Sequence, residues 1–288
     1  KNIYRVESVT EVITVAPSVD VAKTHNLFVG AKEINTLDMY EEKLQVQHFD
    51  LAIDFGCLYM ITKPLLYLLA YTKDLVGNMG LGIILITLLI KLLLFPLANK
   101  SYRSMNRMTA LQPKMQELRK KYEGDNVKLG QAISEMYKKE KINPLGGCLP
   151  ILLQSPVLFA LYKVLYISIE MRQAPFILWI HDLSLPDPLA ILNLFGLIPL
   201  DLPEFLQIGI WPLLMGITML LQQKMSPAPA DPAQANMMLI MPIMFTFMFS
   251  RLPAGLVIYW TFSNILGIAQ QYLIKLLDKK QEIKAKKS

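Results

Sequence analysis

The stretch MGLGIILITLLIKLLLFPL (residues 79–97) decides the fold class of this chain. As an α-helix rising about 1.5 Å per residue it would cover about 28 Å, close to the hydrocarbon core of a bilayer. Its single charge, Lys91, costs about 2.5 to 3.5 kcal/mol inside a membrane, so such a residue usually faces water, a partner or a substrate path. Thr87 lies four residues earlier and shares its helical face. The stretch predicts a membrane span with a functional ammonium group; the alternative is that Lys91 only snorkels to the nearer surface.

The composition agrees with an integral membrane protein. Hydrophobic residues make up 53% of the chain and charged residues only 18%, a larger apolar surplus than that of an ordinary soluble domain. The chain has neither an initiator Met nor a signal peptide, which indicates a fragment trimmed at its N-terminus.

The first 53 residues have the pattern of the end of a β-rich soluble domain. Apolar and polar side chains alternate in IYRVESVTEVITVAP (3–17) and QVQHFDLAIDFG (45–56), as in half-buried strands. So few strands do not close a core alone. His25 and His48 lie here without Cys, Asp or Glu at ligand spacing, so no metal site is predicted.

The next segment, FGCLYMITKPLLYLLAYTKDLV (55–76), is apolar but carries several charges. We expect residues 54–78 to form an amphipathic helix lying in the membrane interface, followed by a turn at Gly77 and Asn78. The alternative is a further membrane span, which the Lys63-Pro64 pair disfavours.

Residues 98–144 are basic, with eleven Lys or Arg against five acidic residues, so they should lie in the cytoplasm. Apolar residues recur at helical spacing on both sides of Gly124 and Asp125, which predicts an antiparallel helical hairpin. Such a hairpin could contact lipid head groups, ribosomal RNA or a nascent chain, or be only a solvated loop that fixes topology.

Five spans in total satisfy the distribution of charge. After residues 79–97 they are predicted at about 148–169, 207–223, 237–250 and 255–276. This arrangement puts loop 98–144, loop 224–236 and the basic tail 278–288 inside. It puts residues 170–205, with one Arg against five acidic residues, outside.

Polar residues in these spans carry the prediction of a site. Gln154 and Ser155 lie in the second span, and Tyr259, Ser263 and Asn264 in the last, where Tyr259 and Ser263 share a face. Each one alone is best explained as a hydrogen bond between packed helices. Together with the polar residues of the first span, they favour one wet cavity.

Sequence motifs for covalent chemistry are lacking. Cys57 and Cys148 fall on opposite sides of the membrane in this topology, so they cannot pair, and neither has a catalytic partner. Gly146-Gly147 lacks the rest of a phosphate-binding loop. We therefore expect no enzyme activity, no cofactor and no metal.

Three runs in a fixed order carry a resemblance: INPLGGCLPILLQSPVLFALY (142–162), MRQAPFILWIHDLSLPDP (171–188) and MPIMFTFMFSRLPAGLVIYWTFSNILGIAQQ (241–271). They closely resemble the YidC family of bacterial membrane protein insertases, which are related to mitochondrial and chloroplast insertases. The resemblance covers about residue 55 to the C-terminus. It identifies residues 1–53 as the end of the family's periplasmic domain, preceded in the family by a first membrane span.

The resemblance implies an all-α polytopic membrane protein of the bacterial inner membrane. Its five-span core (79–277), with the cytoplasmic hairpin, would enclose a hydrophilic groove open to the cytoplasm and to lipid but closed toward the outside. The N-terminal domain would be periplasmic and the C-terminus cytoplasmic. A long apolar insert near 193–210 departs from the family pattern.

The resemblance also assigns groove residues. In the family a single positive residue, usually Arg, lies in the groove, and Lys91 holds the matching position. Thr87, Gln154 and Tyr259 match further groove positions, and Trp260 stands where many relatives have a second Tyr. Ser263, on the Tyr259 face, completes the predicted client groove.

The function implied is insertion of client proteins into the membrane, with help in their folding. Hydrophilic segments of a client would cross through the groove, while its hydrophobic segment slides along the Tyr259 and Trp260 face into lipid. The partners implied are nascent membrane proteins, membrane lipids, the ribosome and the Sec translocon, without a nucleic acid substrate. Two other classes remain open: a small ion or solute transporter that uses Lys91 as its binding site, and a structural subunit. The lack of inverted repeats disfavours a transporter.

Overall fold

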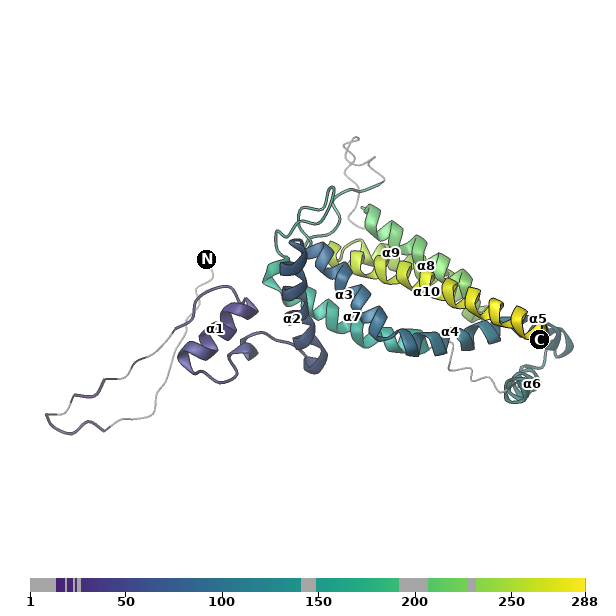
Figure 1. Ribbon diagram of the computed structural model, residues 1–288, viewed down its shortest axis with the longest axis horizontal. Helices are drawn as coiled ribbons and strands as arrows, with labels where there is room; N and C mark the ends of the chain where they lie inside the picture. Colours follow the sequence, from purple (N-terminus) through teal and green to yellow (C-terminus); the bar gives the residue numbers. More distant parts are fainter. Residues whose placement is uncertain are drawn as a thin grey trace. The chain divides into compact units, whose positions relative to one another are not determined.

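The computed structural model describes residues 14–18, 20–22, 24, 27–140, 149–191, 207–226 and 232–287. Residues 1–31 and 32–288 are two separate compact units. Within the described residues the chain is mostly helical and contains no strand, only an isolated bridge between Ala190 and Gly209 (Figure 1). The predicted helical fold class is confirmed at this level.

The second unit begins with α1 (Ile34–Leu44) and the 3-10 helix η1 (Phe49–Ala52). The strand predicted for residues 45–56 is therefore wrong. Backbone N–H groups of His48, Phe49 and Asp50 donate to the carboxylate of Glu41 instead of to a neighbouring strand. Most of the other predicted strand, residues 3–13, lies outside the described residues.

Helix α2 (Tyr59–Val76) leads through a tight turn into α3 (Met79–Leu93). Gly77 makes the turn with a φ of 69°, a conformation that favours glycine. Asn78 then caps α3, because its side chain accepts a hydrogen bond from the backbone N–H of Leu81. The two helices pack against each other.

The predicted span 79–97 is not a single straight helix. Helix α3 ends at Leu93, and α4 (Phe95–Ala110) continues at an angle of 68° to it. Pro96 lies in the first turn of α4, where its missing N–H is tolerated, but it cannot extend the preceding helix. Among the described residues no lone helix combines the length and apolarity needed to cross a bilayer, whereas this bent pair does so by length and composition.

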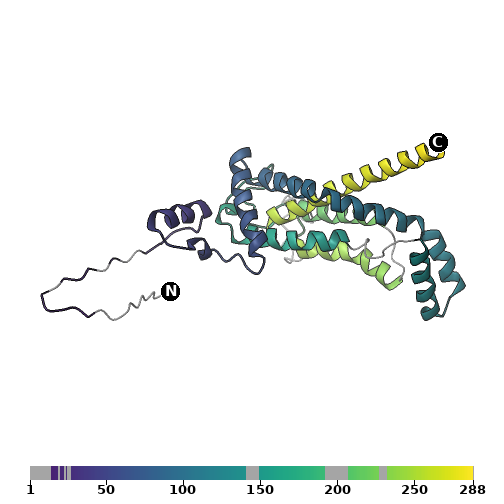
Figure 2. The same ribbon diagram turned by 60° about the horizontal axis from the view of Figure 1, so that its bottom comes forward.

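The other helices of the bundle are α7 (Leu149–Ile167), α8 (Ile210–Met225), α9 (Pro232–Phe249) and α10 (Ala254–Lys287). Helix α10 packs against α3, α4, α7 and α8, and α9 packs against α8 (Figures 1 and 2). Helix α10 has 34 residues and continues through the residues assigned to the basic tail.

Two short helices, α5 (Gln112–Lys121) and α6 (Asn126–Lys139), occupy the basic segment. Gly124, with a φ of 88°, lies in the turn between them. They are joined by a hydrogen bond from the Tyr137 hydroxyl to Met115 Sδ and by an ion pair between Lys114 and Glu140.

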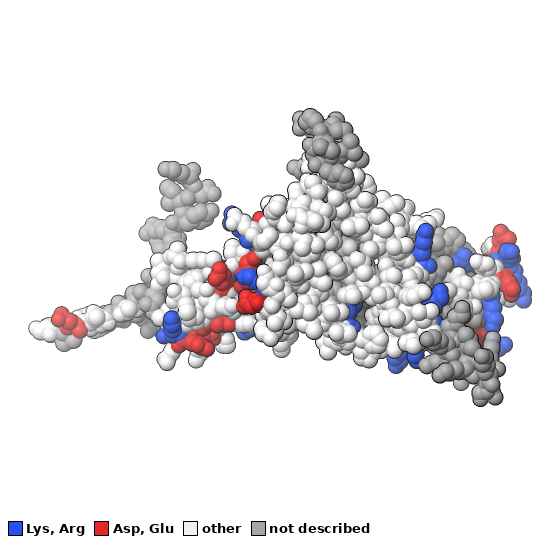
Figure 3. Space-filling model, turned by 45° about the horizontal axis from the view of Figure 1, so that its top comes forward, with Lys and Arg blue, Asp and Glu red and all other residues white. Residues whose placement is uncertain are grey.

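Charge is distributed unevenly over the second unit. The space-filling view shows a wide band with little charge between an end that carries Asp and Glu together with some Lys or Arg and an end where Lys and Arg predominate (Figure 3). Large apolar side chains are exposed on this bundle, among them Leu93, Phe159 and Leu239. Exposed apolar surface on this scale is typical of a surface that contacts lipid or a partner.

Candidate functional site

Three helices bring polar side chains together inside the bundle. Lys91 Nζ on α3 donates a hydrogen bond of 3.3 Å to Gln154 Oε1 on α7. The amide of Gln154 in turn donates to the hydroxyl of Tyr259 on α10. Tyr259 is also hydrogen-bonded to Ser263, one turn further along its helix. We call these four side chains, all predicted as groove residues, the Lys91 network.

The Lys91 network is buried at one end and open at the other. Tyr259 is only 1% exposed, and fully buried Ile83, Leu161 and Ile258 lie in the same bundle core. Lys91 is partly exposed. In the described part of the chain no carboxylate lies within ion-pair distance of it, so its partner inside the protein is a neutral amide.

Thr87 and Trp260 lie outside this hydrogen-bonded chain. The hydroxyl of Thr87 is buried and donates to the carbonyl of Ile83 in the preceding turn, a bond of 2.7 Å. Trp260 follows Tyr259 by about 100° around α10, so it points elsewhere. Its ring packs at a tilt against Phe245 and edge to face against Phe249, both on α9.

One end of the bundle is closed by the segment after α7, which contains the 3-10 helix η3 (Ile169–Met171). The side chain of Asn78 donates to the carbonyls of Pro175 and Phe176, and the Phe176 ring rests directly on Gly80. A Cβ atom at Gly80 would lie 2.1 Å from that ring, so a side chain there would force the ring away.

The same segment also holds the start of α10. The backbone N–H groups of Ala254 and Gly255 donate to the carbonyls of Leu185 and Leu183. Met171 completes the closure, since its Cε would lie 2.5 Å from a Cβ at Gly255. These contacts seal the end of the bundle near Met79, about three helical turns from Lys91.

A second polar cluster lies where α4, α8 and α10 meet, and the sequence-based prediction named only Asn264 of its members, as part of the cavity beside Tyr259 and Ser263. The amide of Asn264 donates to Thr218, that of Gln271 donates to the carbonyl of Met225, and Tyr102 bonds to Gln222. One buried amide atom in each of four side chains has no hydrogen-bond partner among the described residues. These side chains are Asn99, Gln223, Gln270 and Gln271.

This amide cluster could have been found from the sequence. Ser263 and Gln270 are seven residues apart on an apolar helix, so they lie on one face. The cluster extends polarity along α10 beyond the Lys91 network, toward the end that carries the basic helices. Each unpaired buried amide costs about 1 to 3 kcal/mol of folding free energy. This end of the bundle therefore favours water or polar groups as hydrogen-bond partners.

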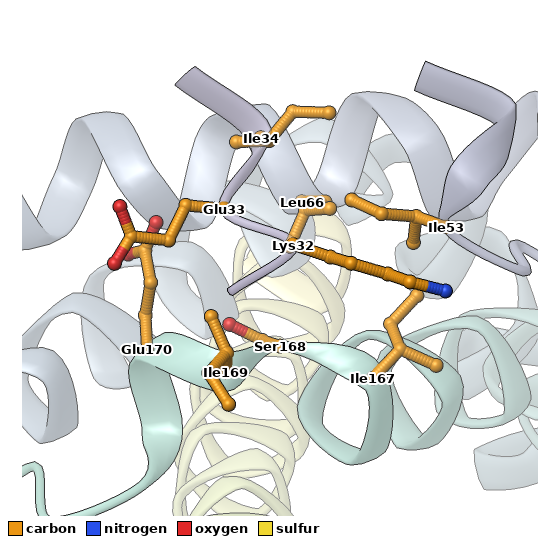
Figure 4. Close-up of a pocket in the computed structure, with 9 residues that line it drawn as sticks. All are labelled: Lys32, Glu33, Ile34, Ile53, Leu66, Ile167, Ser168, Ile169 and Glu170. Carbon is orange, nitrogen blue, oxygen red and sulfur yellow. The ribbon is translucent and has the colours of Figure 1, made fainter. Parts of the chain in front are cut away.

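In the described part of the chain, metal-binding side chains do not cluster beside the network. Within the described residues no group of three His, Cys, Asp or Glu side chains could hold an ion, and predicted non-ligand His25 lies outside them. A cavity of about 10 Å³ lies between Lys32, Leu66 and Glu170 (Figure 4). It has room for about one water molecule.

Helix α2 is fixed to its surroundings by charged contacts. Lys63 Nζ lies 2.7 Å from Asp50 Oδ2, and the Tyr59 hydroxyl donates to the same oxygen. Burial by itself would raise the pKa of Asp50, but the hydrogen bond and charge of Lys63 outweigh it and hold the pKa below 3.8. Lys73 pairs with Glu170 at 3.2 Å, which joins α2 to the end of α7.

A further contact links α2 to α1. The Tyr67 hydroxyl donates to Asp38 over 2.9 Å. Burial and this bond raise the pKa of Tyr67 to about 12. These paired groups show that α2 uses its polar residues for attachment.

Comparison with known families decides where this geometry belongs. Residues 71–282 match the model of a family described as 60Kd inner membrane protein, and residues 1–68 match the YidC periplasmic domain. The chain belongs to the YidC family. Family membership places it in the inner membrane and agrees with a periplasmic N-terminal region.

Relatives in the YidC family are similar over nearly the whole of this chain. Proteins called "Membrane protein insertase YidC" are 55% identical in Rickettsia bellii and 54% identical in Brucella suis, over 96% and 94% of this chain. They match it over 49% and 44% of their own length, so the chain spans about half of these curated relatives.

A solved structure supports the fold. It is titled "Active YidC insertase crystal structure with the first transmembrane domain resolved" and aligns with a TM-score of 0.58 at 24% identity. The alignment covers 82% of this chain and 50% of that one. The YidC-like arrangement of helices is thus established for most of the chain.

Proposed function

We propose that this chain is the core of a membrane protein insertase, which moves hydrophilic client segments across the inner membrane without making or breaking covalent bonds. The observation that carries the proposal is the Lys91 network. An ammonium group lies inside an apolar bundle, bonded to a neutral amide and without a carboxylate partner in the described residues. Its charge is therefore left for a ligand.

The proposed mechanism is a lowering of the transfer barrier. An unpaired charge or backbone group costs several kcal/mol in hydrocarbon, which makes a hydrophilic segment slow to cross. In a groove lined by Lys91, Thr87, Gln154, Tyr259 and Ser263, an acidic client segment would exchange water for these polar partners. The seal formed by Phe176 on Gly80 supports a groove closed at one end.

The hydrophobic part of a client would leave sideways. Trp260 packs on α9, whose other side exposes apolar residues such as Ile243 and Met244. This surface supports release into lipid along α9 and α10. Trp260 then acts as part of the apolar exit and not of the polar network.

The proposed topology has five spans formed by α3, α7, α8, α9 and α10, with residues 1–53 periplasmic and α2 in the interface. The basic segments α4 to α6 and the end of α10 would face the cytoplasm. There the hairpin of α5 and α6 would meet nascent chains, and the ribosome and the Sec translocon are the further proposed partners. Insertase names among the relatives favour this function over a transporter.

The test is insertion of a single-span client with an acidic outer segment into vesicles that contain the full-length protein. Wild type is compared with Lys91→Arg, Lys91→Ala and Lys91→Glu. We expect Arg to preserve insertion, and Ala and Glu to reduce it at least about tenfold, equivalent to about 1.4 kcal/mol. Equal insertion by all four proteins would refute a role for the charge. Solute flux through the vesicles that disappears with Lys91→Ala would favour a transporter.

A further inference from the structure

A second cleft, separate from the Lys91 network, opens at the sealed end of the bundle. It has a volume of about 520 Å³ and lies between the end of α7, the segment after it and the turn before α10. Its apolar lining includes Tyr166, Ile169 and Leu185, each of which is exposed. We call it the Arg172 cleft.

Opposite charges face this cleft without neutralising each other. Arg172 and Asp182 both line it and interact electrostatically, but they form no ion pair in the described part of the chain. Asp182 Oδ1 accepts hydrogen bonds from the backbone and hydroxyl of Ser184. Burial would raise the pKa of Asp182, but these bonds outweigh it and lower the pKa, so the carboxylate stays ionised.

The surroundings place the cleft at a lipid interface. Tyr166 stacks on Tyr162, with ring centroids 5.9 Å apart, and both rings are exposed on α7. Tyrosines exposed near the end of an apolar helix are typical of the membrane–water boundary. The cleft thus combines an apolar wall, one cation and one anion beside two exposed tyrosines of the kind found near lipid head groups.

We propose that the Arg172 cleft binds one phospholipid with a phosphoethanolamine head group, its phosphate against Arg172 and its ammonium against Asp182. The guanidinium suits a phosphate because it can donate two parallel hydrogen bonds. A primary ammonium donates hydrogen bonds to a carboxylate, which a trimethylammonium cannot do. A purely anionic head group would offer no cation to Asp182, whose carboxylate would then have only its hydrogen bonds within the protein. The acyl chains would lie along Ile169 and Leu185.

The test uses the full-length protein in detergent micelles, with bound lipid counted by native mass spectrometry. Phosphatidylethanolamine, phosphatidylcholine and phosphatidylglycerol with identical acyl chains are titrated separately. We expect wild type to bind one phosphatidylethanolamine at least about fivefold more tightly than either other lipid. Arg172→Gln should weaken this binding about tenfold. The control Arg107→Gln, at an exposed Arg on α4 away from the cleft, should not.

Three results would overturn the proposal. One is phosphatidylglycerol binding as tightly as phosphatidylethanolamine, and another is equal loss in Arg172→Gln and Arg107→Gln. The third is crosslinking from position 185 to a client protein and not to lipid. Leu185→Trp, which fills the cleft but keeps both charges, provides a second variant and should also displace the lipid. Lys91→Ala should leave lipid binding unchanged, so failure of this proposal and failure of the proposed insertase function are distinguishable.

Discussion

Two lysines inside apolar helices have opposite environments. Lys63 on α2 lies 2.7 Å from the buried carboxylate of Asp50 and also contacts Tyr59. Among the described residues, Lys91 on α3 is hydrogen-bonded only to the neutral amide of Gln154, at 3.3 Å. The first charge is neutralised within the fold and holds α2 in place, whereas the second stays available. The partner of a buried charge, and not its residue type, therefore separates an attachment from a candidate site.

Removing each ammonium group should produce the largest contrast. Lys63→Met leaves the Asp50 carboxylate buried without its cation, so we expect the free energy of unfolding to fall by about 3 kcal/mol. Lys91→Met replaces an unneutralised charge by an apolar side chain and should not lower stability. Thermal unfolding in micelles, followed by circular dichroism, measures both. A drop of equal size in both variants would remove the distinction between the two lysines.

The difference between the two lysines can be reduced by removing the carboxylate partner of Lys63. Asp50→Asn makes the environment of Lys63 resemble that of Lys91, because a carboxylate is replaced by a neutral amide. We expect a loss of about 2 kcal/mol in stability. The same thermal measurement applies, with Asp54→Asn as the control because Asp54 is a fully exposed partner of Lys163. Comparable losses in the two variants would show that the buried Asp50–Lys63 pair stabilises the fold no more than the exposed Asp54–Lys163 pair does.

The difference can also be reduced by giving Lys91 a carboxylate partner of its own. Gln154→Glu would give Lys91 the carboxylate that Lys63 already has. We expect insertion to fall about fivefold, close to 1 kcal/mol, because the client would then compete with an internal partner. Stability should not fall. The control Ser155→Ala changes the next residue and should keep most of the insertion activity. Full activity of Gln154→Glu would argue against recognition by charge.

The smallest effect should be a dependence on pH. The pKa of Asp50 lies below its ordinary value of 3.8, so its stabilising effect is complete above that value. It is lost as the pH falls through the lower folded-state pKa. Between pH 7 and 5 the Asp50 carboxylate stays ionised, so it should not change the midpoint temperature of unfolding. Below about pH 4 wild type should lose about 2 °C more than Asp50→Asn does.

The sequence predicted that polar residues of three apolar helices lie together, and their role as a client groove stays a prediction. Lys91, Gln154, Tyr259 and Ser263 were predicted to meet, and the structure joins them by hydrogen bonds. Trp260 was grouped with Tyr259 because the family resemblance puts it where many relatives have a second Tyr. Adjacent residues on a helix point about 100° apart, so Trp260 contacts α9 instead.

Features set by tertiary contacts escaped the sequence. Alternation in residues 45–56 indicated a strand, but the carboxylate of Glu41 holds the backbone there in a 3-10 turn. The 68° bend after Leu93 was hidden because apolar residues continue through it to Leu97. Helical spacing alone would have put Gln270 on the face of Ser263, but the burial of Gln271 in the middle of α10 depends on its contact with α8.

The contact of Phe176 with Gly80 has an electrical consequence. An inner membrane stores energy as a voltage, and each elementary charge that crosses 100 mV dissipates about 2.3 kcal/mol. A water-filled groove through the bilayer would be a leak. With one aromatic ring seated on a residue that has no side chain, the proposed groove can hydrate a passing polypeptide while the membrane stays insulating. Glycine at position 80 would thus help to maintain the membrane voltage as well as the packing of this fold.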